Sequence, residues 1–579
     1  MNKHWLRTGR IKRRSTTMHR LLSALCRAKE TGCGLLVLSV LVSADVVSTP
    51  VQSGAAGAAH QSVAGAPNNP TEKQLASDRQ RALQMLDPLF EATSKLAPDL
   101  TKIYLQTRIA DALWEYDEPR ARSRFETALT TCESLKVDVP SADSRSQYRG
   151  DVLEAIKQRD PYWAKKLALD NWHSTKKQEP DMWTLLLLID VDTQLAIQIL
   201  RREIESNATS WLERDLTRLR AKDVAQADEL FTYALLAAAR RSKRSSETFR
   251  ELFNYVFPSK TENYLGFDLG SDKSPARPEL ITRFLAFGCE ALIREANQIE
   301  QESGKHNEVG ERSGMGYMEV QLWLPFFDRY AADCATKIRT RWDAAILSLR
   351  GGKEHIRQTK LMFGPMSKED ALRDAKETKD PMERMALYMR AINLAADEGN
   401  FDEALSLLKT TAEAKVSSDL EVRILVKAAK SAIAVDDADA AYRYTKNLHD
   451  LRTRTELSSD IARMLHKRKD SLRAVNVLNE ALEYARKAGD NWQRPYAMLQ
   501  LANAATLLEP ERGFEVVNQA IEGLNNAKSF VQVFDFDNNL ELLARLNLDR
   551  ALSLAEKLSD NENRLKARIA ICRGVLCKQ

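Results

Sequence analysis

Six histidines follow residue 44, and their spacing tests whether the chain could hold a catalytic metal. Zinc hydrolases place two imidazoles four residues apart on one helix face, as in HxxxH or HExxH. No pair has that spacing, and no GxSxG motif occurs that would carry a nucleophilic serine. The sequence therefore supports neither a zinc site nor a hydrolase triad. The histidines are His60, His173, His306, His355, His449 and His466.

Two glycine-containing segments begin like phosphate-binding loops. Gly314-Met315-Gly316 starts as a dinucleotide fingerprint does, but the third glycine is missing and no strand pattern precedes it. The segment GGKEH, residues 351–355, contains a lysine but lacks the upstream glycine of a phosphate loop. We therefore expect no cofactor.

Five of the seven cysteines lie beyond residue 44: Cys132, Cys289, Cys334, Cys572 and Cys577. Their number is odd, and no CxxC or mixed Cys/His spacing occurs. The sequence therefore predicts neither a disulfide framework nor a zinc site, and it predicts ordinary thiols at Cys572 and Cys577.

Aromatic side chains are concentrated in residues 317–330, at Trp323, Phe326, Phe327 and Tyr330. Aromatic residues beside a glycine-rich segment could form a ligand wall, but they are more often the core of the segment that carries them. We favour the core. Asp and Glu total 81, too many for any two to be selected as catalytic carboxylates. No catalytic residue is assigned.

The elements that would position any site are indicated by a recurring pattern, a small residue followed by apolar or small residues at i+4, i+7 and i+8. These spacings place four side chains on one helix face, and the small residues let a neighbouring helix approach closely. The chain is therefore predicted to be all-α. The pattern occurs at Ala121/Phe125/Ala128/Leu129, Ala227/Phe231/Ala234/Leu235, Ala474/Leu478/Ala481/Leu482 and Gly513/Val517/Ala520/Ile521.

Acidic residues lie shortly before the small residues and mark the predicted turns. The spacing between successive small residues is about 31 to 43, which is typical of helix-turn-helix repeats. Asp160-Pro161 and Asp380-Pro381 have the form of a helix start, so we interpret the acidic residues as N-caps rather than a ligand site. They are Asp117, Asp160, Asp192, Asp223, Asp402, Asp439, Asp470, Glu511 and Asp549.

The stretch from Ser458 to Asp490 resembles a degenerate tetratricopeptide-like repeat. Ile461, Ala462, Leu465, Ala474, Leu478 and Ala481 match the apolar and small positions of that family in order. The segment GNFDEAL, residues 399–405, looks like its inter-helix turn. The resemblance implies an α-α superhelix of antiparallel helix pairs that holds a peptide or protein in its groove.

The first 44 residues have the layout of a secretory signal, a basic segment followed by an apolar run and Val42-Ser43-Ala44. Residues 45–70 are small and polar and are predicted to be a flexible linker. Nine of the 86 basic and one of the 81 acidic residues lie in 1–44, so the remainder has 77 basic and 80 acidic residues, a net charge of −3. We therefore expect no nucleic-acid partner, and membrane contact only through the signal.

Three further segments are predicted: N-terminal repeats in 71–241, an irregular segment in 242–366 and C-terminal repeats in 367–579. Glycine is concentrated in the middle segment, where it marks loops. Two helices are expected there, Pro278 to Glu302 and Tyr317 to Leu349, the second kinked at Pro325.

Two functions remain for such a chain. The first is an exported, non-catalytic scaffold, secreted or periplasmic, that binds a protein or peptide of unknown identity. The second is an all-α hydrolase or lyase of the cell envelope. A closed helical array with paired carboxylates on its inner face would favour the enzyme, and an open superhelix with a polar or aromatic groove would favour the scaffold.

Overall fold

The structure, a computed structural model, describes residues 72–577 with several gaps. Residues 67–579 form one compact unit. The predicted signal peptide, residues 1–44, and the linker, residues 45–70, lie outside the described residues. Within 72–577 the gaps are residues 98, 136–142, 175–180, 207–210, 241–245, 258, 263–267, 271–276, 303–308, 310, 365, 411–416, 490–492 and 527–533.

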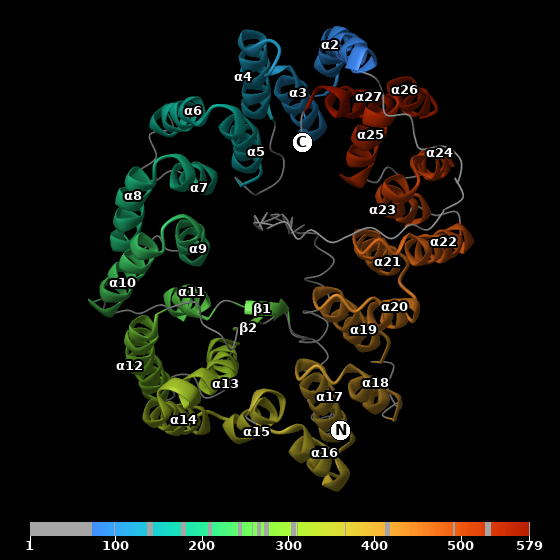
Figure 1. The fold of residues 1–579 in the computed structure, drawn as a ribbon. Coiled ribbons are helices and arrows are strands. Elements are labelled where there is room, and N and C mark those ends of the chain that lie inside the picture. The colour runs from blue at the N-terminus through green and yellow to red at the C-terminus, as the bar shows by residue number, and fades with distance from the viewer. Residues whose placement is uncertain are drawn as a thin grey trace, which may run out of the picture. The chain divides into compact units, whose positions relative to one another are not determined.

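The described residues form 26 helices packed in sequential pairs, which confirms the all-α prediction (Figure 1). They are α2 (Glu72–Ser94), α3 (Leu100–Leu113), α4 (Glu118–Ser134), α5 (Asp143–Arg159), α6 (Pro161–Ser174), α7 (Met182–Val191), α8 (Thr193–Ser206), α9 (Leu212–Lys222), α10 (Val224–Arg240), α11 (Ser246–Val256), α12 (Pro278–Glu302), α13 (Glu311–Tyr330), α14 (Ala332–Leu347), α15 (Gly352–Phe363), α16 (Lys368–Glu377), α17 (Pro381–Asp397), α18 (Phe401–Thr410), α19 (Ser417–Ala434), α20 (Ala438–Lys446), α21 (Leu451–Lys467), α22 (Ser471–Lys487), α23 (Gln493–Leu508), α24 (Pro510–Asn526), α25 (Phe534–Leu546), α26 (Leu548–Glu556) and α27 (Asn561–Leu576).

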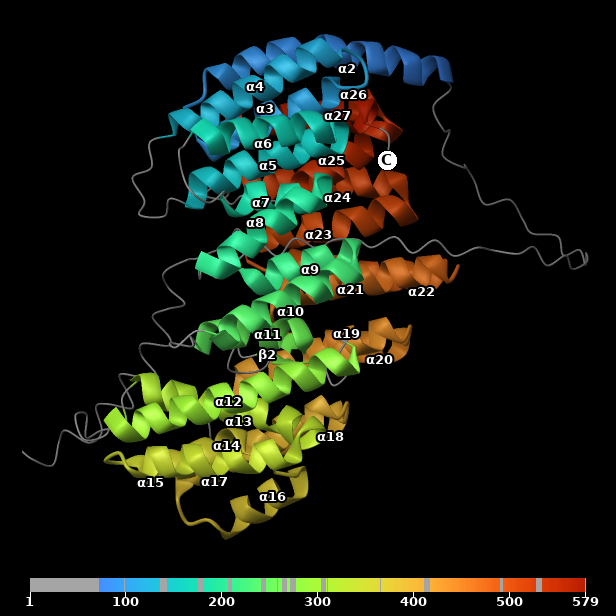
Figure 2. The same cartoon turned by 90° about the vertical axis from the view of Figure 1, so that its left-hand side faces the viewer.

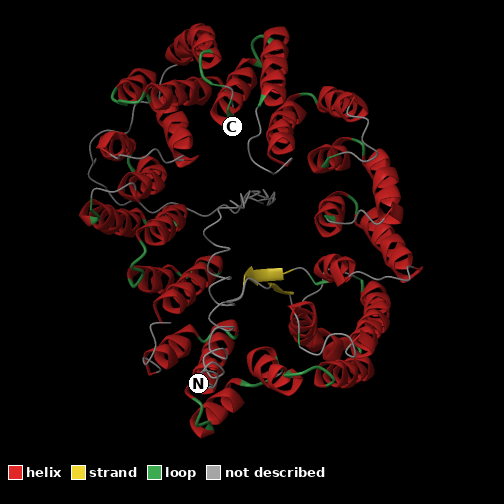
Figure 3. Ribbon diagram, turned by 180° about the vertical axis from the view of Figure 1, so that it is seen from behind, coloured by secondary structure: helices red, strands yellow, loops and turns green. Residues whose placement is uncertain are grey.

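One small antiparallel hairpin interrupts the helices. Strand β1 (Ser259–Glu262) pairs with β2 (Asp268–Gly270) between α11 and α12, inside the segment predicted to be irregular (Figure 3). Its few residues leave helix dominant in the described part of the chain.

Helix starts are fixed by side-chain caps, as the acidic residues predicted. Five of the nine acidic residues accept a hydrogen bond from a backbone N–H in the first turn: Asp117, Asp160, Asp192, Asp223 and Asp470. The other four, Asp402, Asp439, Glu511 and Asp549, lie inside the first helical turn instead. For these four the N-cap interpretation was wrong, although a negative charge there still complements the helix dipole.

The small-residue stripes pack as predicted. Ala121, Ala227 and Ala474 have no solvent-exposed surface, and Gly513 is also buried. A Cβ added to Gly513 would lie 2.1 Å from Thr506 Oγ1 on the preceding helix, so the close approach of α23 and α24 requires glycine. The stripes are therefore the contact surfaces between neighbouring helices.

Enlarging a stripe alanine should destabilise the fold. Ala474 and Ala481 on α22 are 0% and 3% exposed, so replacing either with leucine is expected to cost about 1–3 kcal/mol through overpacking. Lys487, exposed on the same helix, is the control, and Lys487→Leu should change little. Thermal unfolding of the three variants measures this. Equal, negligible shifts in Tm would show that the stripe does not face a neighbour.

Helix α27 packs against α2 and α3, the first two helices of the described residues, so the succession of helix contacts closes on itself. Figures 1 and 2 both show α27 beside α2 and α3. A single buried cluster joins Leu86 and Phe90 of α2 to Leu105 of α3 and to Ile569 and Cys572 of α27. The described helices therefore form the predicted array of consecutive helix pairs, and the two ends of this array meet.

Helix α2 takes the place of the second helix of a pair beside α27. In this part of the chain the second helices of the pairs are α20, α22, α24 and α26. Arg473 of α22 pairs with Asp439 of α20, and Arg550 of α26 pairs with Glu511 of α24. The same kind of ion pair continues from α26 to α2, where Arg81 Nη1 lies 2.5 Å from Asp549 Oδ1. Helix α2, the first helix of the described residues, thus completes the last C-terminal helix pair.

The middle segment differs from its prediction in two details. Helix α12 has the predicted bounds, but the second expected helix is two, α13 and α14, separated at Ala331. The Gly314–Gly316 segment, expected in a loop, lies in α13. One buried cluster extends from Leu185 to Leu349, so the core continues across the expected boundary at residue 241.

Candidate functional site

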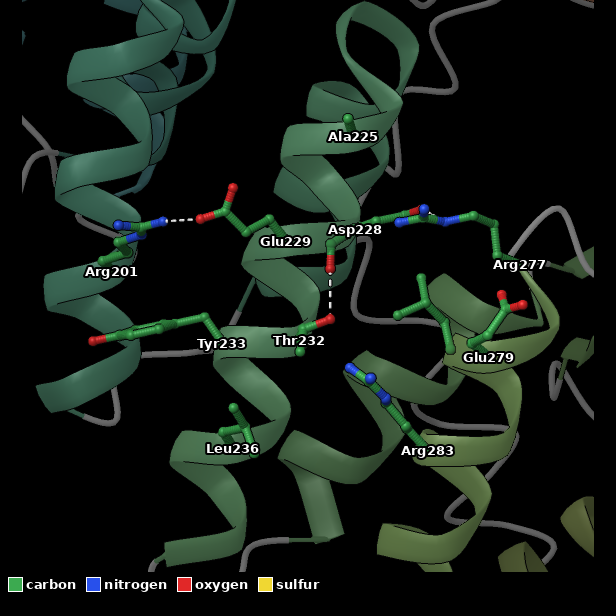
Figure 4. Close-up of a pocket in the computed structure, with 11 residues that line it drawn as sticks. Arg201, Ala225, Asp228, Glu229, Thr232, Tyr233, Leu236, Arg277, Glu279 and Arg283 are labelled. Carbon is green, nitrogen blue, oxygen red and sulfur yellow. Dashed lines mark hydrogen bonds and ion pairs between the residues drawn. The ribbon is translucent and has the colours of Figure 1, made fainter.

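A pocket of about 730 Å³ lies between α8, α10 and α12 (Figure 4). Most of its lining residues are charged or polar, and Ala225, Leu236 and Leu280 add apolar surface. The lining residues are Arg201, Ala225, Asp228, Glu229, Thr232, Tyr233, Leu236, Arg277, Glu279, Leu280 and Arg283.

A buried carboxylate organises one wall of the pocket. Asp228 on α10 has a side chain with no exposed surface. Its Oδ1 accepts hydrogen bonds from the Tyr255 hydroxyl at 3.0 Å and from Arg220 Nη2 at 3.4 Å, and its Oδ2 accepts one from Arg277 Nε at 2.9 Å. A charge buried this deeply requires such partners. Asp228 therefore holds Arg277 in position at the pocket edge.

The opposite wall joins α8 to α10 through an ion pair and a ring contact. Arg201 Nη2 lies 2.6 Å from Glu229 Oε1, and the Arg201 guanidinium lies 5.5 Å from the Tyr233 ring centre. Leu236, also in the lining, has half of its surface exposed. The wall therefore offers charged, aromatic and aliphatic groups together, a combination that a polypeptide can match.

A second group of charges lies where α27 meets α3. Arg573 bridges Asp111 of α3 and Glu541 of α25, and Arg108 of α3 also pairs with Glu541. The side chains of these four residues are 14–20% exposed. Burial alone would raise the pKa of Asp111, but Arg573 and Arg159 overcome it and hold that pKa below its usual range. We call these four residues the seam network.

Asp537, one turn before Glu541 on α25, differs from Asp111 in the direction of its pKa shift. Burial raises its pKa, and the Tyr104 hydroxyl donates a 2.6 Å hydrogen bond to Asp537 Oδ2. Arg108 Nη2 lies 4.0 Å from the same oxygen. Arg108 of α3 therefore lies near two carboxyl groups of α25, those of Asp537 and Glu541.

One carboxyl group on α5 combines exposure to solvent with a raised pKa. The pKa of Asp151 is raised to about 6. The larger cause is desolvation of its carboxyl group, and the negative charge of Glu154 adds to it. Glu154 itself pairs with Lys157, whose Nζ lies 2.7 Å from Glu154 Oε1. Two carboxyl groups three residues apart on a helix share a face. A pair of this kind can divide general acid and base roles.

The Asp151 titration is directly measurable. We expect an apparent pKa of about 6 for its carboxyl carbon in a ¹³C NMR titration of aspartate-labelled protein, and Glu154→Gln should lower that pKa. Because the folded pKa lies above the usual 3.8, protonation favours the folded state. This group's contribution to stability therefore improves as pH falls from about 6 toward 4. An Asp151 resonance that titrates near pH 4 in both proteins would contradict the assignment.

Three of the four aromatic residues named in 317–330 form core, as favoured from the sequence, and Tyr330 does not. Trp323, Phe326 and Phe327 are 7%, 9% and 0% exposed. The Trp323 ring packs 4.6 Å from that of Phe249, centre to centre, while Tyr330 remains 42% exposed. Trp323 is therefore unavailable as a ligand wall.

The cysteine prediction was wrong for one pair. Cys289 on α12 and Cys334 on α14 form a disulfide, with their Cα atoms 5.9 Å apart. They have no motif spacing because helix packing, not sequence proximity, brings them together. Cys132 and Cys572 are buried free thiols, and burial raises the pKa of each to about 12.

The pocket and the seam network escaped sequence reasoning. In the sequence, Asp228 directly follows the stripe residue Ala227, and an aspartate next to a helix-packing position is the signal that could have indicated a buried carboxylate.

Among the described residues, no cluster of His, Cys, Asp and Glu could hold a metal ion. Within the same residues, no helix has the length and apolar character needed to span a membrane.

Comparison with known proteins finds a match among solved structures but none by sequence. No protein-family profile and no curated protein sequence matches the chain. Among solved structures, the chain is similar to a circular tandem repeat protein with novel repeat topology and enhanced subunit contact surfaces. The match covers 86% of this chain and 96% of the other, with 15% sequence identity and a TM-score of 0.11. The chain is a helical tandem-repeat protein, as its own helix contacts show.

Proposed function

We propose that this protein is an exported, non-catalytic scaffold that binds a polypeptide partner in the pocket between α8, α10 and α12. The observation that carries the proposal is the lining, in which exposed guanidinium and carboxylate groups surround Tyr233 and Leu236. Extended polypeptides present the complementary charges, hydrogen-bonding groups and apolar side chains.

Two features of the sequence support this proposal. The tetratricopeptide-like character of residues 458–490 implies a family whose helix pairs hold peptides. The secretory layout of residues 1–44 implies export, and the Cys289–Cys334 disulfide is typical of proteins in oxidising compartments. We therefore propose a secreted or periplasmic location.

Peptide selection tests the proposal. A displayed random peptide library is selected against the full chain, and the affinities of recovered peptides are measured by fluorescence anisotropy. Leu236→Glu, in the pocket, should weaken binding roughly tenfold or more, as expected for an apolar contact replaced by a desolvated charge. Leu472→Glu changes a leucine that is 75% exposed on α22 and should have little effect. Failure to recover binding peptides, or equal affinities for both variants, would refute the proposal.

A cell-envelope hydrolase is the second candidate. Two features were expected of that enzyme, a closed helical array and paired carboxylates on its inner face. The helix array is closed, and the carboxylate pair Asp151/Glu154 is the observation that favours an enzyme. A screen of the protein against polysaccharide, peptidoglycan and ester substrates tests this function. Hydrolysis that Asp151→Asn abolishes would establish the enzyme, whereas absence of turnover would leave the scaffold as the function.

A further inference from the structure

Helix α12 brings two arginines to the pocket from one side. Arg277 directly precedes the helix and Arg283 lies in its second turn, with the buried Leu280 between them. Figure 4 shows the Arg283 guanidinium directed toward Thr232 on α10 and the Arg277 guanidinium beside Asp228. Two cationic groups therefore face the same part of α10.

Arg277 is positioned without using all of its donors. Its Nε donates to Asp228, and no interaction of its two Nη nitrogens is found within the described residues. The side chain is 63% exposed. A guanidinium carries five N–H donors in a planar fork, so a group held through Nε still presents its other donors to a ligand.

Arg283 has no ion-pair partner in the part of the chain that the structure describes. The lining has three arginines and three carboxylates, so its formal charges balance. Arg201 pairs with Glu229 at the α8 side, and the Asp228 side chain has no exposed surface. The exposed charges toward α12 are therefore those of Arg277, Arg283 and Glu279, two cations and one anion, although the chain beyond residue 44 has net charge −3.

We propose that the pocket selects an acidic segment of the polypeptide partner, whose carboxylate side chains pair with Arg283 and Arg277. Arginine binds carboxylates through two parallel N–H···O bonds, which add geometric specificity to charge attraction. Leu236 and Tyr233 contact the neighbouring apolar side chains of that segment. This inference rests on the proposed function and specifies the chemistry of its ligand.

Three fluorescein-labelled peptides of equal length, with four Glu, four Gln or four Lys at identical positions in one neutral host sequence, test the inference by anisotropy. Charge-assisted hydrogen bonds correspond to roughly tenfold in affinity or more, so the Glu peptide should bind at least tenfold more tightly than the Gln peptide. Arg283→Glu should remove that preference. Arg341→Glu is the matched charge reversal, at an exposed residue on α14 outside the lining, and should retain it.

A gain of affinity provides an independent check against misfolding. Glu279 is the carboxylate on α12 nearest in sequence to both arginines and has no ion-pair partner among the described residues. Glu279→Gln should strengthen binding of the Glu peptide roughly two- to fivefold, with the gain shrinking at 0.5 M salt. If selected peptides bind the pocket but show no acidic enrichment, and Arg283→Glu binds like wild type, the acidic-segment inference is refuted while polypeptide binding stands. If no peptide binds at all, both fail.

Discussion

Replacing Arg573 by methionine is expected to lower the free energy of unfolding by about 3–5 kcal/mol. The side chain is 14% exposed and bridges Asp111 and Glu541, which are 17% and 15% exposed. Methionine keeps most of the packing volume but leaves two largely buried carboxylates without this partner. Removing one member of a buried ionic group costs more than the group contributes, because the remaining charges stay desolvated. Urea unfolding followed by circular dichroism measures the change.

Arg568 is the matched control on the same helix. It pairs with Glu556, and both side chains are 40–49% exposed. Exposed pairs contribute about 1 kcal/mol or less, so Arg568→Met should have a small effect. Equal losses from the two substitutions would mean that the seam network is solvated like any surface ion pair.

Removing the disulfide should have an effect of similar size. Cys289 and Cys334 close a loop with a sequence separation of 45, for which the chain-entropy relation gives about 4 kcal/mol. The double variant Cys289→Ala/Cys334→Ala should therefore unfold at lower urea concentration than wild type.

Chemical reduction of the wild-type protein distinguishes the loss of the disulfide from changes in side-chain packing that the alanine substitutions cause. Treating wild-type protein with dithiothreitol should reproduce most of the loss seen in the double variant, while Cys577→Ser, which changes a free thiol, should be nearly neutral. A wild-type unfolding midpoint that reductant leaves unchanged would contradict the Cys289–Cys334 bond.

Local physical chemistry made much of the fold predictable. Asp160 before Pro161 fixes a helix start through an N-cap and a fixed proline φ, and both signals lie within a few residues. The stripe around Ala474 follows from helical periodicity alone, and its burial is confirmed. Asp439 and Asp549 were assigned wrongly as caps because the residues that do cap these helices, Asp437 and Asn547, lie two positions earlier, and Asp and Asn both serve as caps.

Contacts between distant segments could not be predicted in the same way. Arg573 and Asp111 are separated by 462 positions, and each looks in sequence like a charge on a solvated helix face. The disulfide depends on α12 and α14 lying side by side, which the cysteine spacing does not encode. The pocket depends on Asp228 being buried and on Arg277 reaching it across 49 positions. Such pairings emerge only when the helices are placed in space.

A double-mutant cycle on Arg573 and Asp111 tests the closure of the helix array most directly. The free energies of unfolding of wild type, Arg573→Met, Asp111→Asn and the double variant are compared under one set of conditions. Because the two residues contact each other only if α27 packs against α3, we expect the single effects to be non-additive by about 1–3 kcal/mol. Additivity within about 0.5 kcal/mol would show that α27 does not pack against α3 and would contradict the closed array.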